Sequence, residues 1–284
     1  MADRPLCSLD IAFRSQSSKG IDMNMTNLRR GALSLAHVLA FTAAFWMVGA
    51  VASTIPEVGI VKEAPKIDGR LDEKCWTVAE WNGGFSRLAN SVKDRSVGAQ
   101  TRFAFLADDR TLYVAVKCDE PNMDSLKATP PRAIYTCDEV ELFLCPRGDG
   151  FEFYQFVVAF DPRNGEGVRY FSEGGIISPD PYGPSWKFAR GELKDGWCVE
   201  IAIPFSSFYM TRNAEWRDNW KVNVARMRWT GGLVNSTWSQ LERGFLEPNN
   251  FRKIKGFPKR MEADDVGITD VVAEMSGRQG GKLV

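Results

Sequence analysis

Apolar and polar residues alternate with a period of two along much of the chain. In residues 138–146 three aliphatic side chains fall on one side of an extended strand, at Val140, Leu142 and Leu144. Glu139, Glu141 and Phe143 fall on the other side. Because successive side chains of a strand point to opposite faces, this pattern predicts a strand with one face in the core.

The same pattern recurs in short segments separated by turn-forming residues. Residues 101–109 and 111–120 alternate on either side of Asp108-Asp109-Arg110, which predicts a tight hairpin. Similar segments follow at 151–160, 185–193, 196–208 and 220–229. Helical periodicity is confined to short turns near residues 72–80 and 204–210. Many short strands at regular intervals predict an all-β sandwich or barrel with a few short helical turns.

The N-terminal segment has the features of an export signal. Arg29 and Arg30 precede an uncharged apolar run that ends in Ala50-Val51-Ala52, a small-x-small cleavage pattern. We expect cleavage after Ala52 and a secreted, periplasmic or cell-surface protein. The alternative is an uncleaved N-terminal membrane anchor, because the apolar run is about twenty residues long. The predicted organisation is a leader over 1–52, one sandwich domain over 53–257 and a flexible tail over 258–284.

Charge and histidine content exclude several classes of function. Without residues 1–52 the chain has 31 basic and 33 acidic residues, so we expect neither nucleic acid nor an anionic membrane as a partner. The only histidine, His37, lies in the leader. The predicted domain therefore has no histidine for a Ser-His-Asp triad, a zinc site or histidine-ligated haem.

Cysteine spacing points to no metal site. Five cysteines follow the leader, at positions 75, 118, 137, 145 and 198. Their spacings match no metal-binding pattern, and an odd number leaves at least one thiol free. We expect buried thiols or one or two disulfides.

The order of motifs is similar to that of a known family. The segments IDGRLDEKCWTVAEW, LADDRTLYVAVKCDEP, DEVELFLCP, GWCVEIAIPFSSF and WKVNVARMRW follow one another over most of the expected domain. This series resembles the family 9 carbohydrate-binding modules, which belong to the DOMON-like β-sandwiches. The resemblance implies a two-sheet antiparallel sandwich of jelly-roll type. It also implies that a glycan binds in a slot between aromatic rings, with no catalysis.

The resemblance also suggests site residues. The two rings of the slot correspond to Tyr135 and Trp238, and the acid that binds sugar hydroxyls corresponds to Glu141. Family members with a sugar site carry an arginine where this chain has Val157. Arg226 or Arg228, which alternate on one strand, could replace it, or both could pair with Glu139 or Glu141 on a neighbouring strand. The predicted carbohydrate-binding residues are therefore Tyr135, Asp138, Glu141, Arg226 and Trp238.

A structural calcium ion is a further expectation, since family members carry one and exported sandwiches bind calcium through acidic turns. The candidate ligands are Asp68, Asp72 and Asp119. We expect a monomer that binds a polysaccharide or oligosaccharide and no haem. Two alternatives stay open: an envelope or cell-surface protein that has lost sugar binding, and a glycoside hydrolase that uses two carboxylates.

Overall fold

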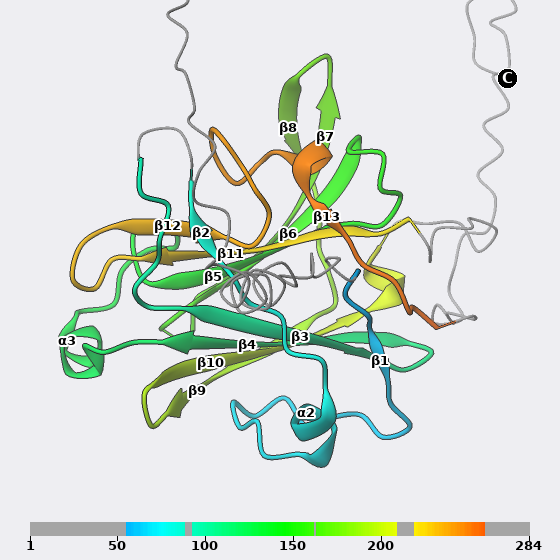
Figure 1. Cartoon of the computed structure of the whole chain (residues 1–284). Helices are drawn as coiled ribbons and strands as arrows, with labels where there is room; N and C mark the ends of the chain where they lie inside the picture. Colours follow the sequence, from blue (N-terminus) through cyan, green and yellow to red (C-terminus); the bar gives the residue numbers. More distant parts are fainter. Residues whose placement is uncertain (1–54, 89–92, 162, 209–218, 259–284) are drawn as a thin grey trace, which may run out of the picture. The chain divides into compact units, whose positions relative to one another are not determined.

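The computed structural model describes residues 55–88, 93–161, 163–208 and 219–258 (Figure 1). The leader expected over 1–52 lies outside the described residues, as does nearly all of the tail expected from residue 258. Among the helices of the described part, none is long and apolar enough to cross a membrane.

Two β-sheets form the fold, as the sequence predicts. One sheet has five strands in the order β1-β3-β4-β10-β9, and the other has eight, in the order β2-β12-β11-β5-β6-β7-β8 with β13 paired to β11 (Figure 1). The strands of the first sheet are β1 (Gly59–Ile60), β3 (Thr101–Ala107), β4 (Thr111–Asp119), β9 (Lys187–Leu193) and β10 (Gly196–Pro204). Those of the second are β2 (Ser86–Arg87), β5 (Glu139–Cys145), β6 (Glu152–Ala159), β7 (Gly165–Glu173), β8 (Ile176–Asp180), β11 (Lys221–Arg228), β12 (Val234–Thr237) and β13 (Arg252–Lys253).

The helical elements are short. They are α2 (Lys74–Val78), α3 (Met123–Ala128) and the two 3₁₀ turns η2 (Phe205–Ser207) and η3 (Pro248–Asn250). The strands pair antiparallel except for β1, which runs parallel to β3. The hairpin predicted at Asp108-Asp109-Arg110 joins β3 to β4.

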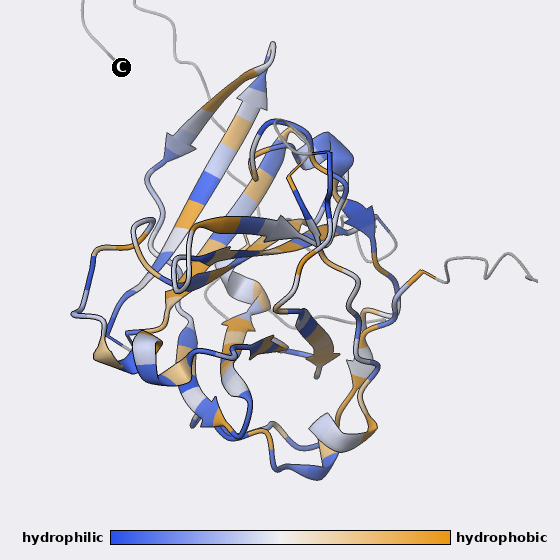
Figure 2. Ribbon diagram, turned by 60° about the vertical axis from the view of Figure 1, so that its left-hand side comes forward, coloured by the Kyte–Doolittle hydropathy of each residue, from blue (hydrophilic) through white to orange (hydrophobic). Residues whose placement is uncertain are grey.

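Apolar side chains fill three layers. The main core lies between the sheets and contains Val140, Leu142 and Leu144, on the side of β5 that the alternation predicts. A second cluster around Trp76 covers the outer face of the five-stranded sheet. A third, which includes Phe143, covers part of the outer face of the eight-stranded sheet. Hydropathy alternates along several strands (Figure 2), as expected where one face of a strand lies in the main core and the other face also carries polar side chains.

Glu200 on β10 anchors the segment that precedes α2. Its Oε2 accepts the backbone N–H groups of Asp68, Gly69 and Arg70, at 3.2, 2.8 and 3.2 Å. Its Oε1 accepts the indole N–H of Trp76 at 3.0 Å. A Cβ at position 69 would lie 2.5 Å from the carbonyl oxygen of Arg190, so the close approach requires glycine.

All five cysteines of the described part are free thiols, and no disulfide joins them. Cys118, Cys145 and Cys198 are buried. Of the two outcomes expected from the sequence, thiols rather than disulfides are found, and Cys75 and Cys137 are only partly buried.

Candidate functional site

Two acids of β5 project from the outer face of the eight-stranded sheet. Glu139 and Glu141 are 0% and 2% exposed. Glu141 lies between Ala225 of β11 and Val157 of β6, which are its partners in the strand register. Position 157 is thus the cross-strand neighbour of Glu141. A valine there supplies no guanidinium group to the carboxylate.

A short chain of hydrogen bonds holds Glu141. The side-chain amide of Gln155 donates to Glu141 Oε2 at 2.6 Å. The hydroxyl of Tyr170 on β7 donates in turn to Gln155 Oε1 at 2.9 Å. Burial, followed by the negative charge of Glu139, raises the pKa of Glu141 to about 8. The carboxyl group therefore stays near its titration point at neutral pH.

Glu139 has unused hydrogen-bonding capacity. Its Oε2 accepts the backbone N–H of Tyr135 at 2.8 Å and the thiol of Cys137 at 3.6 Å. Its Oε1 is buried and has no hydrogen-bond partner. Burial raises the pKa of Glu139 to about 7. No arginine or lysine of the described part forms an ion pair with Glu139 or Glu141, so this is a pair of buried acids without a counter-charge.

Tyr135 is the exposed aromatic residue of this region. It is 40% exposed and has a φ of 68°, a left-handed conformation that is unfavourable for a bulky side chain. Its hydroxyl donates to Glu166 Oε2 at 3.2 Å. Burial of its hydroxyl end raises the pKa of Tyr135, and the charges of Glu166, Tyr170 and Glu141 raise it further. Tyr135 therefore lies in the same electrostatic cluster as Glu141.

We call this group the outer-face site; it consists of Tyr135, Glu139, Glu141, Gln155, Glu166 and Tyr170. The sequence indicated Tyr135 and Glu141 through the family resemblance. It did not indicate Glu139, Gln155, Glu166 or Tyr170. The information that would have identified these residues is the pairing of strands β5, β6 and β7, in which residues 141, 157 and 166 are successive cross-strand partners.

Trp238 does not lie in the glycan-binding slot expected from the family resemblance. It is 4% exposed and belongs to the core between the sheets. Its ring packs edge-on against Phe103, with the centroids 5.0 Å apart, and the Arg252 guanidinium lies 3.8 Å from its centroid. The reason is the alternation along β12. Thr237 pairs with Ala225 on the outer face, so the next residue points inward. Trp238 therefore offers no exposed ring to a sugar.

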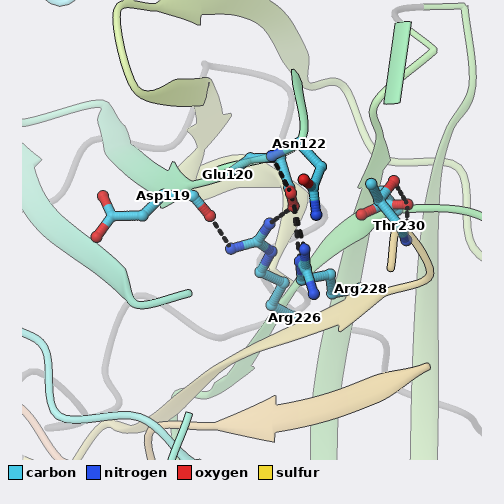
Figure 3. A network of polar contacts seen from close by, with 7 residues as sticks. Asp119, Glu120, Asn122, Arg226, Arg228 and Thr230 are labelled. Atoms are coloured by element: carbon cyan, nitrogen blue, oxygen red, sulfur yellow. Dashed lines mark hydrogen bonds and ion pairs between the residues drawn. The ribbon is translucent and has the colours of Figure 1, made fainter. Parts of the chain in front are cut away.

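Arg226 also points inward, where it joins the two sheets (Figure 3). It is 1% exposed, and its Nη2 lies 3.0 Å from Glu120 Oε2, beyond the end of β4. Its Nη1 donates to the carbonyl oxygen of Asp119 at 2.8 Å. Arg228 binds both carboxylate oxygens of Glu120, at 2.7 and 2.8 Å. The expectation that Arg226 replaces the missing arginine of the outer face is therefore wrong, because its guanidinium lies on the opposite side of the sheet.

Asp138 lines a cleft to which Glu141 does not contribute. Its Oδ2 accepts the backbone N–H and the hydroxyl of Thr230, both at 3.0 Å. Burial raises the pKa of Asp138. The residue lines a cleft of about 410 Å³ together with Phe160, Arg190 and Trp229. The predicted group of five residues is thus divided among the outer-face site, this cleft and the core.

The three acids predicted for calcium do not form one cluster. Arg70 binds Asp72, and its backbone N–H donates to Asp68 at 3.0 Å. Asp119 pairs with Arg102 at 2.7 Å. Among the described residues, no group of three or more His, Cys, Asp or Glu side chains is arranged to hold a metal ion.

The two-sheet β-sandwich allows a comparison with known families. The family model described as "Carbohydrate family 9 binding domain-like" matches residues 67–226, and the chain belongs to this family. The matched range contains Tyr135 and Glu141 and ends before Trp238.

Several solved structures are similar to the chain. One is a family 9 carbohydrate-binding module from Caldicellulosiruptor kristjanssonii in complex with glucose, with 21% identity, a TM-score of 0.45, and coverage of 74% of this chain and 97% of that one. A family 9 module from the same organism in complex with cellotriose has 19% identity, a TM-score of 0.45, and coverage of 75% and 97%. A Bacteroides uniformis protein has 17% identity, a TM-score of 0.47, and coverage of 70% and 96%. No curated protein matches the chain.

Proposed function

We propose that the protein is an exported, non-catalytic carbohydrate-binding protein that holds a glycan at the outer-face site. The observation that carries the proposal is the pair of buried acids, Glu139 and Glu141, that have no cationic partner among the described residues and lie beside the exposed ring of Tyr135. Membership of the carbohydrate family 9 binding domain-like family supports the same ligand class.

The chemistry of a sugar suits this arrangement. Sugar hydroxyls are donors as well as acceptors, so a hydroxyl would satisfy Glu139 Oε1, which is buried without a partner, if the side chain turns outward on binding. A second can replace or extend the contact between Gln155 and Glu141. The apolar C–H face of a pyranose ring can pack on Tyr135, which is the exposed aromatic of the site. Because Trp238 is in the core, the proposed site has one exposed aromatic wall rather than two.

Export is the part of the proposal that rests on the sequence alone. The basic residues Arg29 and Arg30, the apolar run and the Ala50-Val51-Ala52 pattern support a cleaved signal. A protein that reaches an extracellular or envelope compartment would meet polysaccharides there. N-terminal sequencing of the exported protein tests this step, and a mature N-terminus at Ser53 is the expected result.

A glycoside hydrolase is the second candidate, because Glu139 and Glu141 lie two residues apart on one strand face and both have a raised pKa. Alternate residues of a strand are about 6.6 Å apart, which is near the carboxyl spacing of inverting glycosidases. A hydrolase must bring both acids against the scissile bond. Membership of a family of carbohydrate-binding domains favours binding over catalysis.

A glycan array, followed by a reducing-sugar assay on each glycan that binds, distinguishes these functions. The full chain is compared with Glu141→Gln and with Glu173→Gln, a matched control at an exposed position of β7. We expect binding without sugar release, loss of binding in Glu141→Gln and normal binding in Glu173→Gln. Release of sugar would favour the hydrolase. Absence of both binding and release would favour a structural protein of the cell envelope.

A further inference from the structure

A cleft of about 410 Å³ opens at one end of the sandwich, on the opposite side of β5 from the outer-face site. Asp138 and Glu139 are neighbours in sequence, and alternation sends their side chains to opposite faces. The cleft is lined by residues of α3, of the segment that precedes β5, of the β6–β7 turn, of β9 and of the segment that follows β11. Its volume lies in the range of small-molecule sites.

Three buried polar atoms of the cleft residues have no hydrogen-bond partner in the described part of the chain. They are the acceptor Asp138 Oδ1 and the donors Arg190 Nε and Trp229 Nε1. Asp138 is only 4% exposed, so its free oxygen is buried within the cleft wall. Buried polar atoms without partners are rare in folded proteins, and three beside one cavity point to a ligand.

The cleft also offers apolar surface. Phe160 and Trp229 both line it, and the Arg190 guanidinium lies 4.2 Å from the centroid of the Phe160 ring. Aromatic surface with polar groups at its edges suits a ring that has C–H faces and equatorial hydroxyls. A hydroxyl would donate to Asp138, and oxygens of the same ring would accept from Trp229 and Arg190.

The charged side chains around the cleft indicate which class of ligand it suits. Arg163 pairs with Asp161 at 2.8 Å, and Lys127 and Arg190 both pair with Glu192. Arg132, which is exposed at the cleft, has no ion pair within the described residues. The Arg132 guanidinium, which is unpaired among the described residues, and the two donors without partners there favour a ligand that carries a carboxylate.

We propose that this cleft, here called the end cleft, is a second carbohydrate-binding site that takes an acidic sugar of the hexuronate class. The sugar hydroxyls meet Asp138, and its carboxylate meets Arg132. The end cleft shares no residue with the outer-face site, so either site can bind when the other is disabled.

Titration of the ¹⁵N-labelled full chain with sodium D-glucuronate and sodium D-galacturonate tests this proposal. D-glucose and sodium acetate serve as comparison ligands. The readout is the indole N–H signal of Trp229, which is assigned by its loss in Trp229→Phe. At least one uronate is expected to shift this signal, with glucose and acetate at least about tenfold weaker. Equal affinity for glucose or acetate, or no shift with either uronate, would overturn the proposal.

Variants separate this site from the outer-face site. Arg132→Gln and Asp138→Asn should each weaken uronate binding about tenfold, as expected for loss of one charge-assisted hydrogen bond. Arg70→Gln, an exposed arginine remote in sequence, is the matched control and should bind normally. Glu141→Gln should also bind uronate normally. If Glu141→Gln abolishes uronate binding, the end cleft is not the site. If uronate binds but no glycan binds at the outer face, the proposed function fails and this inference stands.

Discussion

Glu120 and Glu141 are both buried glutamates, each 2% exposed. They differ in their hydrogen-bond partners, which are positively charged for Glu120 and neutral for Glu141. Glu120 is bound by Arg226 and Arg228 and by the backbone N–H of Asn122. Glu141 accepts a hydrogen bond from the side-chain amide of Gln155. Burial opposes ionisation of Glu120, but the hydrogen bonds from Arg228 and Asn122 outweigh it and lower its pKa. Burial of Glu141, together with the charge of Glu139, raises its pKa to about 8.

The difference shows which acid serves the fold and which is available to a ligand. Glu120 follows β4 of one sheet and binds two arginines of β11 in the other, so it connects the layers (Figure 3). Its hydrogen-bonding capacity is used internally. Glu141 and Glu139 lie on an outer face, where no arginine or lysine of the described residues pairs with them, and Glu139 Oε1 has no hydrogen-bond partner. Acids with strongly perturbed pKa values and unused capacity are typical of functional sites.

The largest effect is expected for Glu120→Gln. This change leaves Arg226 buried without its ion pair, which should lower the free energy of unfolding by about 3–5 kcal/mol. Urea denaturation at pH 7 measures the loss. Glycan binding by the folded fraction should be unchanged. A free energy of unfolding equal to that of the wild type would show that Glu120 does not join the sheets.

The second prediction concerns pH. The raised pKa of Glu141 means that the folded chain binds its proton more tightly than the unfolded chain does. Its contribution to stability is therefore full below its ordinary value of 4.5 and is lost as the pH rises through about 8. Glu120 behaves in the opposite way, because its lowered pKa stabilises the fold above pH 4.5 and that contribution is lost on acidification.

Denaturation of the wild type and of Glu141→Gln across this range measures the effect. The wild type should lose stability relative to the variant as the pH rises from 4.5 to 8, with a slope of at most about 1.4 kcal/mol per pH unit. The subtraction removes the contribution of Glu200, whose burial raises its pKa to about 7. Parallel stability curves for the two proteins would contradict a raised pKa at Glu141.

The third prediction tests Tyr135. Tyr135→Ala should weaken glycan binding by about 1 kcal/mol or more, since the aromatic wall of the proposed site is lost. The free energy of unfolding should change by no more than about 0.5 kcal/mol, because the side chain is 40% exposed. Tyr135→Phe keeps the ring and removes the hydroxyl that donates to Glu166, so it should bind nearly as well. Calorimetric titration that finds equal affinity for Tyr135→Ala and wild type would remove this ring from the site.

The smallest effect is expected for Arg102→Gln. Arg102 and Asp119 form an exposed ion pair, with side chains 53% and 42% accessible. Solvent and salt screen such pairs, so the free energy of unfolding should fall by less than about 1 kcal/mol. A loss as large as that of Glu120→Gln would mean that burial is not what distinguishes the two ion pairs.

Local patterns predicted much of the fold. The alternation in residues 138–146 placed Val140 in the core and Glu141 opposite it, and the β3–β4 hairpin followed from its turn residues. Such features depend on neighbours in sequence. The family resemblance pointed to Val157 as the position of the missing arginine, and the β5–β6 register places that position beside Glu141.

The orientation of Trp238 and the partners of Arg226 could not be predicted in this way. Trp238 turns inward because of the register of β12 on β11, which sequence periodicity over four residues does not fix. Arg226 meets Glu120, a residue 106 positions away on the other sheet. The end cleft is likewise assembled from five separate segments. These features depend on how the two sheets pack together, which cannot be predicted from any single segment of the sequence.

The most direct test of the outer-face site is the affinity of Glu141→Gln for the glycan that binds best on the array. Isothermal titration calorimetry at about pH 9, where Glu141 with its pKa of about 8 is ionised, compares it with the wild type and with Glu173→Gln. Loss of a hydrogen bond to a carboxylate should raise Kd at least about tenfold in Glu141→Gln and leave Glu173→Gln unchanged. A Glu141→Gln variant that is folded and binds with the wild-type Kd would contradict a role for the buried acids in sugar binding.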